Sequence, residues 1–179
     1  MKYIFIGPSG AGKGTFIKEI IELIPRAISC TTRAPREREI DGKDFYFLKN
    51  TEETKKEMLK SVAYDDKHRG VCYFTKEEEF KKHKNCLCEM SEKGVKDLRK
   101  YFGKENVKVI YIYANPDQCY ERILNRNGRE YADMRMYHNH KENSFDNHRI
   151  ADYVIINNNE NDYKKNVELL KYIIKSTMD

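Results

Sequence analysis

The sequence predicts an α/β fold of three layers, in which helices cover both faces of a central parallel sheet. Short apolar runs typical of buried strands alternate with segments of helical periodicity, as where residues 107–113 precede residues 117–124. A glycine-rich turn also joins the first apolar run, residues 2–6, to the first helical segment. This alternation indicates a parallel sheet, because each parallel connection needs a crossover that is usually a helix.

The first half of the chain contains three short apolar runs and three helical segments. The first helix is expected over residues 16–24, and Pro25 ends it because proline cannot continue the helical hydrogen bonding. Thr51 and Thr75 each precede a group of glutamates, which predicts that a helix begins after each of them. The stretch between those helices, residues 62–74, lacks a period and is expected to be irregular. Strands are expected at residues 2–6, 27–30 and 45–48.

The second half alternates more regularly. Strands are expected at residues 86–90, 107–113 and 153–156, and helices at residues 93–102 and 117–124. Polar residues around Gly128 separate two helical stretches, so residues 125–131 are expected to form a mobile flap. The last helix presents an apolar face formed by Val167, Leu170, Ile173 and Ile174.

The composition is that of a globular chain of one domain. The 179 residues are 39% hydrophobic and 35% charged, which excludes a disordered chain. No apolar run reaches the roughly 20 residues of a membrane span, and residues 1–7 are too short a run for a signal peptide, so a cytoplasmic protein without membrane contact is expected. The 34 Lys and Arg residues outnumber the 29 Asp and Glu residues, but they are interleaved with glutamates, which argues against nucleic-acid binding. Five irregularly spaced cysteines indicate reduced thiols.

The strongest functional signal is the glycine-rich loop between the first strand and the first helix. The loop consists of Gly7, Pro8, Ser9, Gly10, Ala11, Gly12, Lys13, Gly14 and Thr15. Its glycines let backbone N–H groups converge on a phosphate, the helix N-terminus adds its dipole, and Lys13 can reach the terminal phosphates of a nucleotide. An ordinary glycine turn is the competing interpretation, but chance seldom combines strand, lysine and helix in this order. Gly14 stands where many such loops have a magnesium-binding hydroxyl. The GKGT form of residues 12–15 resembles that of nucleoside monophosphate kinases, and the resemblance implies that nucleotide and water hold most of the Mg²⁺ coordination.

A second anion-binding signal follows the loop. Arg33 and Arg36 lie three residues apart around Pro35, and arginine is suited to bidentate phosphate binding. Surface charge is the alternative interpretation, but a phosphoryl transferase needs an acceptor site opposite its donor phosphates. The surrounding residues 31–79, which fit the strand and helix alternation poorly, are therefore interpreted as an inserted acceptor-binding region.

These segments resemble guanylate kinases. The phosphate loop, the S-x-T-T-R-x-P-R pattern at residues 29–36 and a D-G-x-D-[YF]-x-F pattern at residues 41–47 have the order and spacing of that family, and weaker similarity covers nearly the whole chain. The resemblance implies a P-loop NTPase fold with an inserted acceptor-binding region and a helical lid. It implies an ATP- and Mg²⁺-dependent kinase, monomeric or homodimeric, that phosphorylates GMP or dGMP. The implied division is a core at residues 1–30, 84–124 and 150–179, an acceptor-binding region at 31–83 and a lid at 125–149.

The resemblance also implies a role for individual residues. The catalytic residues are expected to be Lys13, Arg33, Arg126 and Arg135. The ATP donor is expected to contact the phosphate loop together with Arg122, Arg126 and Asn157. The acceptor is expected to contact Ser29, Arg33, Arg36, Phe45, Tyr64, Asp65, Tyr73, Thr75, Glu89, Ser91 and Arg135. Any protein ligands of Mg²⁺ are expected to be Thr15 and Glu89.

The sequence departs from the family at the positions that read the base. Glu89 and Ser91 stand where the family has two aspartates, so one acid is lengthened and the other is lost. Tyr64 stands where a family glutamate reads the N1–H and 2-amino groups of guanine. Asp65 or Asp66 is the candidate substitute if the loop shifts by a residue or two.

A further departure concerns the acceptor phosphate. Phe45 replaces a family tyrosine whose hydroxyl contacts this phosphate, and the adjacent Tyr46 is a candidate replacement. Changed polar groups in a base-reading site should relax or redirect specificity. Another nucleoside monophosphate, or a sugar phosphate as in ribose 1,5-bisphosphate phosphokinases, therefore stays open as acceptor. A non-catalytic phospholigand-binding module also stays open, although such modules typically have damaged phosphate loops and Lys13 is intact here.

Overall fold

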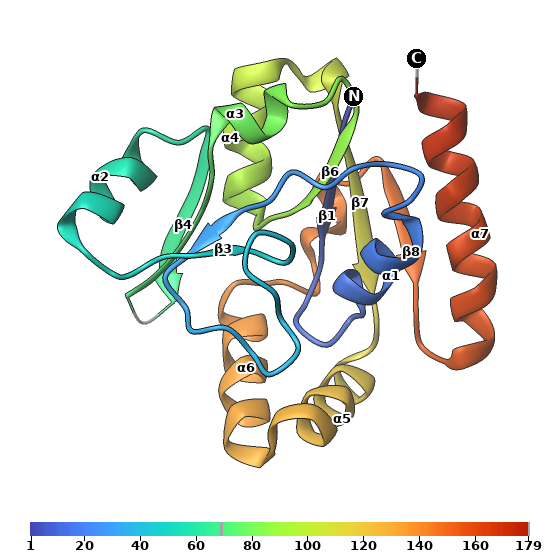
Figure 1. Ribbon diagram of the computed structural model, residues 1–179. Coiled ribbons are helices and arrows are strands. Elements are labelled where there is room, and N and C mark those ends of the chain that lie inside the picture. Colours follow the sequence, from blue (N-terminus) through green and yellow to red (C-terminus); the bar gives the residue numbers. More distant parts are fainter. Residues whose placement is uncertain (69, 179) are drawn as a thin grey trace.

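In the computed structural model, which describes residues 1–68 and 70–178, four parallel strands form a central sheet in the order β6-β1-β7-β8 (Figure 1). They are β1 (Lys2–Ile6), β6 (Cys86–Glu89), β7 (Val107–Tyr113) and β8 (Tyr153–Ile156). The predicted parallel sheet is thus confirmed. All five residues of β1 are buried, as expected of a strand that is covered on both faces.

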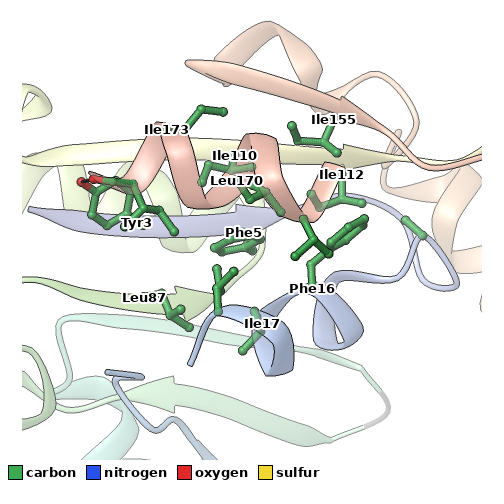
Figure 2. Packing of buried hydrophobic residues seen from close by; sticks show 14 of the residues in the cluster. Tyr3, Phe5, Phe16, Ile17, Leu87, Ile110, Ile112, Ile155, Leu170 and Ile173 are labelled. Carbon is green, nitrogen blue, oxygen red and sulfur yellow. Dashed lines mark hydrogen bonds between the residues drawn. The ribbon is translucent and has the colours of Figure 1, made fainter. Parts of the chain in front are cut away.

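Alternate residues of the central strands enter two separate cores. On one face, Tyr3 and Phe5 pack with α1 (Lys13–Ile20) and α7 (Glu160–Thr177), as Figure 2 shows. On the other face, Ile4 and Ile6 pack with α4 (Glu92–Phe102). The predicted inner residues of the last helix, Val167, Leu170, Ile173 and Ile174, are all buried. Helices therefore cover both faces of the sheet, which confirms the three-layer prediction.

A second sheet lies beside the central one, on the side opposite to α7 (Figure 1). Its strand order is β3-β2-β5-β4, and its strands are β2 (Cys30–Thr31), β3 (Tyr46–Phe47), β4 (Ala63–His68) and β5 (Val71–Thr75). Helix α2 (Glu52–Leu59) covers its outer face through Met58, which packs with Cys30, Cys72 and Phe74.

This second sheet corrects two predictions. Residues 62–74, expected to be irregular, form most of the β4–β5 hairpin. Strand β4 has no apolar pattern that would predict it, and it is stabilised by its backbone pairing with β5. The strand expected at residues 27–30 lies instead at Cys30–Thr31 and belongs to the second sheet. Only Arg26, which bridges to Leu87, pairs with the central sheet in this segment.

The predicted helix-end signals hold at the start of α2 but not at the start of α3 (Glu77–Lys81) or the end of α1. Thr51 caps α2, with its side chain accepting a hydrogen bond from the Thr54 amide, whereas Thr75 lies in β5 and Lys76 precedes α3. Helix α1 ends at Ile20, four residues before the predicted end, and continues as turns. Within the part of the chain that the structure describes, 3₁₀ helices form at Lys104–Asn106 and Asn147–Ile150.

The expected flap at residues 125–131 is mostly helical. Helix α5 (Pro116–Asn127) runs to Gly128, and α6 (Arg129–Lys141) begins directly after it. Gly128 adopts a φ of 80°, and its amide closes α5 on the Leu124 carbonyl. Two helices joined by one glycine therefore replace the predicted loop.

All five cysteines are buried and unpaired with one another, as expected. Among the described residues, no helix has both the length and the apolar character of a membrane span.

Candidate active site

The phosphate loop follows β1 and adopts a backbone that only glycine fits. Gly7, Gly10 and Gly12 have φ values of 137°, 88° and 99°. A Cβ atom on Gly7 would lie 2.1 Å from the Ile112 carbonyl oxygen, and one on Gly10 would lie 2.5 Å from that of Cys119. The loop therefore requires glycine at these positions for two reasons. The backbone there is left-handed, and neighbouring backbone atoms lie too close to leave room for a Cβ atom.

Side chains around the loop hold its carbonyl groups. Lys13 Nζ donates to the carbonyls of Gly7 and Pro8 at 2.8 and 2.9 Å. Two residues from elsewhere in the chain hold the next carbonyls, with Arg122 Nη1 3.3 Å from the Gly10 oxygen and Asn157 Nδ2 2.8 Å from the Ala11 oxygen. The first amides of a helix have no carbonyl partner one turn earlier, so the start of α1 is suited to an anion.

Asn157 is part of this support rather than an open contact point. It was predicted to touch the donor, but its side chain is buried and its amide is committed to the loop, while its own carbonyl accepts from Arg122. Removing the side chain of Asn157 or of Arg122 would therefore leave a carbonyl group of the phosphate loop without its hydrogen-bond donor.

Glu89, at the carboxyl end of β6, lies next to Lys13, the first residue of α1. Glu89 ends β6, and its Oε1 is 3.5 Å from Lys13 Nζ. Thr15 is exposed in the first turn of α1. The described residues contain no cluster of three metal-ligating His, Cys, Asp or Glu side chains. One carboxylate beside an anion-binding loop suits Mg²⁺, which keeps several waters and takes its other ligands from substrate phosphates.

Ser91 has a structural partner. It is the N-cap of α4, and its Oγ accepts a hydrogen bond from the Gly94 amide at 3.3 Å. A serine here caps the helix, whereas it cannot supply the second acidic group expected at this position.

The predicted acceptor arginines converge on one carboxylate that the sequence analysis did not single out. Glu39 accepts from Arg33 Nη2 at 2.9 Å through Oε1 and lies 2.9 Å from Arg33 Nη1 through Oε2. The same carboxylate accepts from the Arg36 amide at 2.8 Å. Burial raises the pKa of Glu39, but hydrogen bonds from Arg33 and from the Arg36 backbone outweigh it, so the pKa lies below its ordinary value. Arg33 and Arg36 thus meet at Glu39, and we call this pair of arginines the cationic cradle.

Phe45 contacts two guanidinium groups. Its ring centroid lies 5.4 Å from Arg26 Cζ and 5.5 Å from Arg33 Cζ, and 6.0 Å from the ring of Tyr73. Arg26 Nε is buried with no hydrogen-bond partner among the described residues. No motif surrounds Arg26, so sequence reasoning had no signal for it. Phe45 is thus a stacking surface for the arginines rather than a hydrogen-bond donor.

Tyr46 does not replace the missing phenol. Its hydroxyl donates to Glu79 Oε1 at 3.2 Å, and its ring packs on the outer face of the second sheet. Adjacent strand residues point to opposite faces, so Tyr46 and Phe45 cannot serve the same site.

Strand register also separates Tyr64 from Asp65. Opposed residues of neighbouring strands share a face, and Asp65 is opposite Tyr73, which is opposite Thr31. Tyr64 is opposite Phe74 and packs with the outer core beneath α2, where Lys93 Nζ lies 3.6 Å from its ring centroid.

We call the other face, formed by Ser29, Thr31, Asp65, Tyr73 and Thr75, the inner face. Ser29 Oγ is 2.7 Å from Thr75 Oγ1 and 3.5 Å from Cys88 Sγ, so this part of the inner face contacts β6 of the central sheet. On the same inner face, Arg33 Nε donates a hydrogen bond to the Tyr73 hydroxyl at 3.2 Å. The register thus places Asp65 on the inner face and Tyr64 on the outer face, while the contact of either residue with an acceptor stays a prediction. The side chain of Asp66, the other candidate reader, lies outside the described residues.

Helix α6 contacts the phosphate loop through Ser9. Arg135 Nε donates to Ser9 Oγ at 3.0 Å. Asn139, which is buried, accepts from the Ser9 amide at 2.9 Å and donates to the Ser9 carbonyl at 3.2 Å. Sequence analysis predicted Arg135 at this site but missed Asn139, whose i+4 spacing from Arg135 was the available signal.

Three arginines repel one another where α5, α6 and the Arg33–Arg36 segment meet. Burial, and then the charges of Arg36 and Arg135, lower the pKa of Arg126. Such a cluster of cations is stable when it binds an anion. The site thus has a donor-type anion site at the phosphate loop, an acceptor-type cradle at Arg33 and Arg36, and further cations between them, an arrangement suited to phosphoryl transfer.

Comparisons with known proteins agree with this geometry. The guanylate kinase family model matches residues 1–177. The guanylate kinase of Thermotoga maritima is 29% identical to this chain over 97% of the chain and 86% of its own length. That of Prochlorococcus marinus subsp. pastoris is 32% identical over 97% of this chain and 96% of its own. The crystal structure of guanylate kinase from Anaplasma phagocytophilum has the same fold, with a TM-score of 0.66 at 21% identity, over all of this chain and 86% of that one.

Proposed function

The chain belongs to the guanylate kinase family, and we propose that it transfers the terminal phosphoryl group of ATP to GMP. The observation that carries the proposal is the pairing of an intact phosphate loop with the Arg33–Arg36 cradle. The loop suits the donor phosphates, and the cradle suits an acceptor that already bears a phosphate. The intact Lys13 disfavours the non-catalytic alternative.

On the donor side, Lys13 and the first amides of α1 bind the β- and γ-phosphates. Lys13 leaves the loop carbonyls that it contacts in this structure and follows the phosphates. Glu89 would orient water around Mg²⁺, and Thr15 would be a further oxygen ligand near the loop. The metal, when bound, neutralises charge on the transferring phosphate.

On the acceptor side, Arg33 and Arg36 bind the phosphate of GMP, and the Tyr73 hydroxyl adds a hydrogen bond. Glu39 keeps the guanidinium of Arg33 and the backbone of Arg36 in one orientation. Phe45 supports Arg33 from its ring face.

Asp65 reads the base. Guanine presents two neighbouring donors, N1–H and the 2-amino group, and a carboxylate accepts from both. Its place on the inner face, beside Tyr73 and near the Ser29–Thr75 hydroxyl pair, supports this role. An acid on this face favours guanine over adenine, which lacks both donors on that edge.

Catalysis rests on positioning and electrostatics, because phosphoryl transfer passes through a loose transition state with little covalent work for the protein. Arg126 and Arg135 stabilise the charge that spreads over the transferring group. Docking of α6 against Ser9 excludes water, which suppresses wasteful hydrolysis of ATP. Because such nucleotides and reduced thiols belong to the cytoplasm, that is where we propose that the reaction takes place.

A coupled assay of ADP release tests the proposal. ATP and Mg²⁺ are supplied with GMP, dGMP, IMP, AMP, UMP or ribose 1,5-bisphosphate, and Lys13→Ala serves as the blank. Turnover is expected with GMP at a kcat/KM at least tenfold above AMP and UMP, and none with the blank. Preferred turnover of another acceptor would refute the guanine assignment, and absence of turnover with every acceptor would refute the kinase assignment.

A further inference from the structure

One face of α6 contacts both halves of the active site. Tyr131, Arg135 and Asn139 are spaced four residues apart, so they lie one above another on the helix. Arg135 and Asn139 hold Ser9 of the phosphate loop. At the other end of the same stripe, the Tyr131 hydroxyl accepts from Arg36 Nη2 at 3.4 Å. A rigid helix therefore joins the donor loop to an arginine of the acceptor cradle.

The surroundings of Tyr131 make its oxygen a hydrogen-bond acceptor. The residue is half-buried, and three guanidinium groups, those of Arg36, Arg126 and Arg135, act on it. Burial raises the pKa of Tyr131, but the hydrogen bond from Arg36 and the charges of Arg36, Arg135 and Arg126 outweigh it, so the pKa lies below its ordinary value. Cations on several sides favour negative charge on the phenol oxygen, which strengthens the bond that it accepts from Arg36.

We propose that Tyr131 is a positioning residue that couples acceptor binding to the docking of α6 on the phosphate loop. The proposal rests on the proposed function, because it takes Arg36 as a ligand of the acceptor phosphate.

The coupling follows from the freedom of Arg36 before the acceptor binds. The side chain of Arg36 is 40% exposed, and its guanidinium contacts Glu39 only at 3.4 Å, so it is loosely held. A phosphate in the cradle fixes this guanidinium through strong, directional hydrogen bonds. Tyr131 then meets a fixed donor, which favours the docked position of α6. The docked helix in turn keeps Arg135 and Asn139 on Ser9, where the ATP phosphates bind.

Binding linkage makes this coupling measurable. If GMP favours the docked helix and ATP favours it too, each ligand raises the affinity for the other by the same factor, typically about 5- to 150-fold for coupled sites. Removing the Tyr131 hydroxyl takes away the contact that carries the effect while both binding sites remain.

Isothermal titration calorimetry tests the proposal. The affinity of a nonhydrolysable ATP analogue with Mg²⁺ is measured with and without saturating GMP, and GMP is titrated with and without the analogue. Tyr131→Phe removes only the hydroxyl. Tyr137→Phe is the matched control, because it makes the same change on the same helix at a residue that is 63% exposed.

The coupling factor of the parent chain is expected to be at least about fivefold. Tyr131→Phe should bring it below about twofold while each ligand alone binds within about threefold of the parent affinity, and Tyr137→Phe should leave it unchanged. In turnover, Tyr131→Phe should raise the ratio of ATP hydrolysis to GMP phosphorylation.

Two results would overturn the proposal. One is an unchanged coupling factor in Tyr131→Phe. The other is a loss of GMP affinity in Tyr131→Phe that is as large without the ATP analogue as with it. That result would make Tyr131 an ordinary acceptor ligand. Neither depends on turnover, so a chain that binds both nucleotides with coupling but transfers no phosphate would refute the proposed function and leave this inference standing.

Discussion

Glu39 binds Arg33 with both carboxylate oxygens, Oε1 at 2.9 Å from Nη2 and Oε2 at 2.9 Å from Nη1. Arg33 donates two further hydrogen bonds, to the Tyr73 hydroxyl and the Ala34 carbonyl, at 3.2 and 2.6 Å. Its guanidinium is therefore held in one orientation before any ligand arrives. Glu39 lies in the cradle as an internal anion that organises the acceptor site.

Glu39→Gln should weaken acceptor binding more than it slows the chemical step. The amide keeps the shape but loses the charge and one acceptor, so the Arg33 guanidinium and the Arg36 backbone lose their fixed orientation. We expect the KM for GMP to rise about tenfold, equivalent to about 1.4 kcal/mol, with kcat changed by less than about threefold. Steady-state kinetics measures both, and Glu37→Gln, at an exposed neighbour, is the control. A fall in KM would show instead that Glu39 competes with the phosphate.

The same residue should leave a signature in the pH dependence of stability. The folded-state pKa of Glu39 lies below its ordinary value of 4.5 because hydrogen bonds from Arg33 and Arg36 outweigh the effect of burial. Its stabilising effect is therefore fully present above about pH 4.5 and is lost as the pH falls through the lower, folded-state pKa. The difference in melting temperature between the parent chain and Glu39→Gln should be constant between about pH 6 and 8 and should shrink below about pH 4.5. A difference that grows in acid would contradict the assignment.

Asp65 and Tyr64 give opposite predictions for specificity. Asp65→Asn should lower kcat/KM for GMP by about 10- to 100-fold. The substitution removes the charge that strengthens the hydrogen bonds, and it places an NH₂ donor against one of the two donors of guanine. IMP, which lacks the 2-amino group, should lose less. Tyr64→Phe should change neither value by more than about twofold, since its ring packs on the outer face. If Tyr64→Phe is damaging and Asp65→Asn is silent, the register argument is wrong.

Ser91→Ala should cost stability and little else. The substitution removes the N-cap of α4, worth about 1 kcal/mol in urea unfolding. Thr51→Ala, which removes the cap of α2, should cost a similar amount and calibrates the measurement. A large drop in kcat/KM for GMP with stability intact would show that Ser91 contacts the acceptor.

Two glycines of the phosphate loop should respond in opposite directions. Gly10→Ala forces a φ of 88° on alanine and brings its Cβ to 2.5 Å from the Cys119 carbonyl, so it should destabilise the chain by at least about 1–2 kcal/mol. Gly14 lies in α1, and a methyl group there would have nothing within 4 Å, so Gly14→Ala should stabilise the chain by about 0.5–1 kcal/mol. Urea unfolding without nucleotide separates them. Equal effects would mean that the loop relaxes more readily than its packing indicates.

The central sheet and the phosphate loop were predictable because their signals are local. The buried run of β1 and the glycines at Gly7, Gly10 and Gly12 report on the backbone at their own positions, and the structure has them where the sequence predicts. Arg33 and Arg36 likewise lie close together because only two residues separate them.

The second sheet was harder because its strands depend on their partners. Residues 63–68 read Ala-Tyr-Asp-Asp-Lys-His, a polar run that has little strand propensity of its own. A change of one residue in register moves every side chain to the opposite face. The family pattern alone therefore places Tyr64 at the base-reading position, whereas pairing with β5 turns Asp65 to the inner face.

Long-range supports were also out of reach. Arg26 and Asn139 belong to no motif, and the partner of Asn139 lies 130 residues away in the sequence. Only the tertiary arrangement brings Asn139 to Ser9 or Arg26 to Phe45.

The stripe on α6 also limits how the gene for this chain can change. Tyr131 and Asn139 are eight residues apart, which corresponds to about 12 Å along the helix axis. Inserting or deleting one residue between them would turn Tyr131 by about 100° away from Arg36 while Asn139 stayed on Ser9. Substitutions at outward positions such as Tyr137 leave that spacing intact. Across descendants of this chain, α6 should therefore vary in composition and remain constant in length from residue 131 to residue 139.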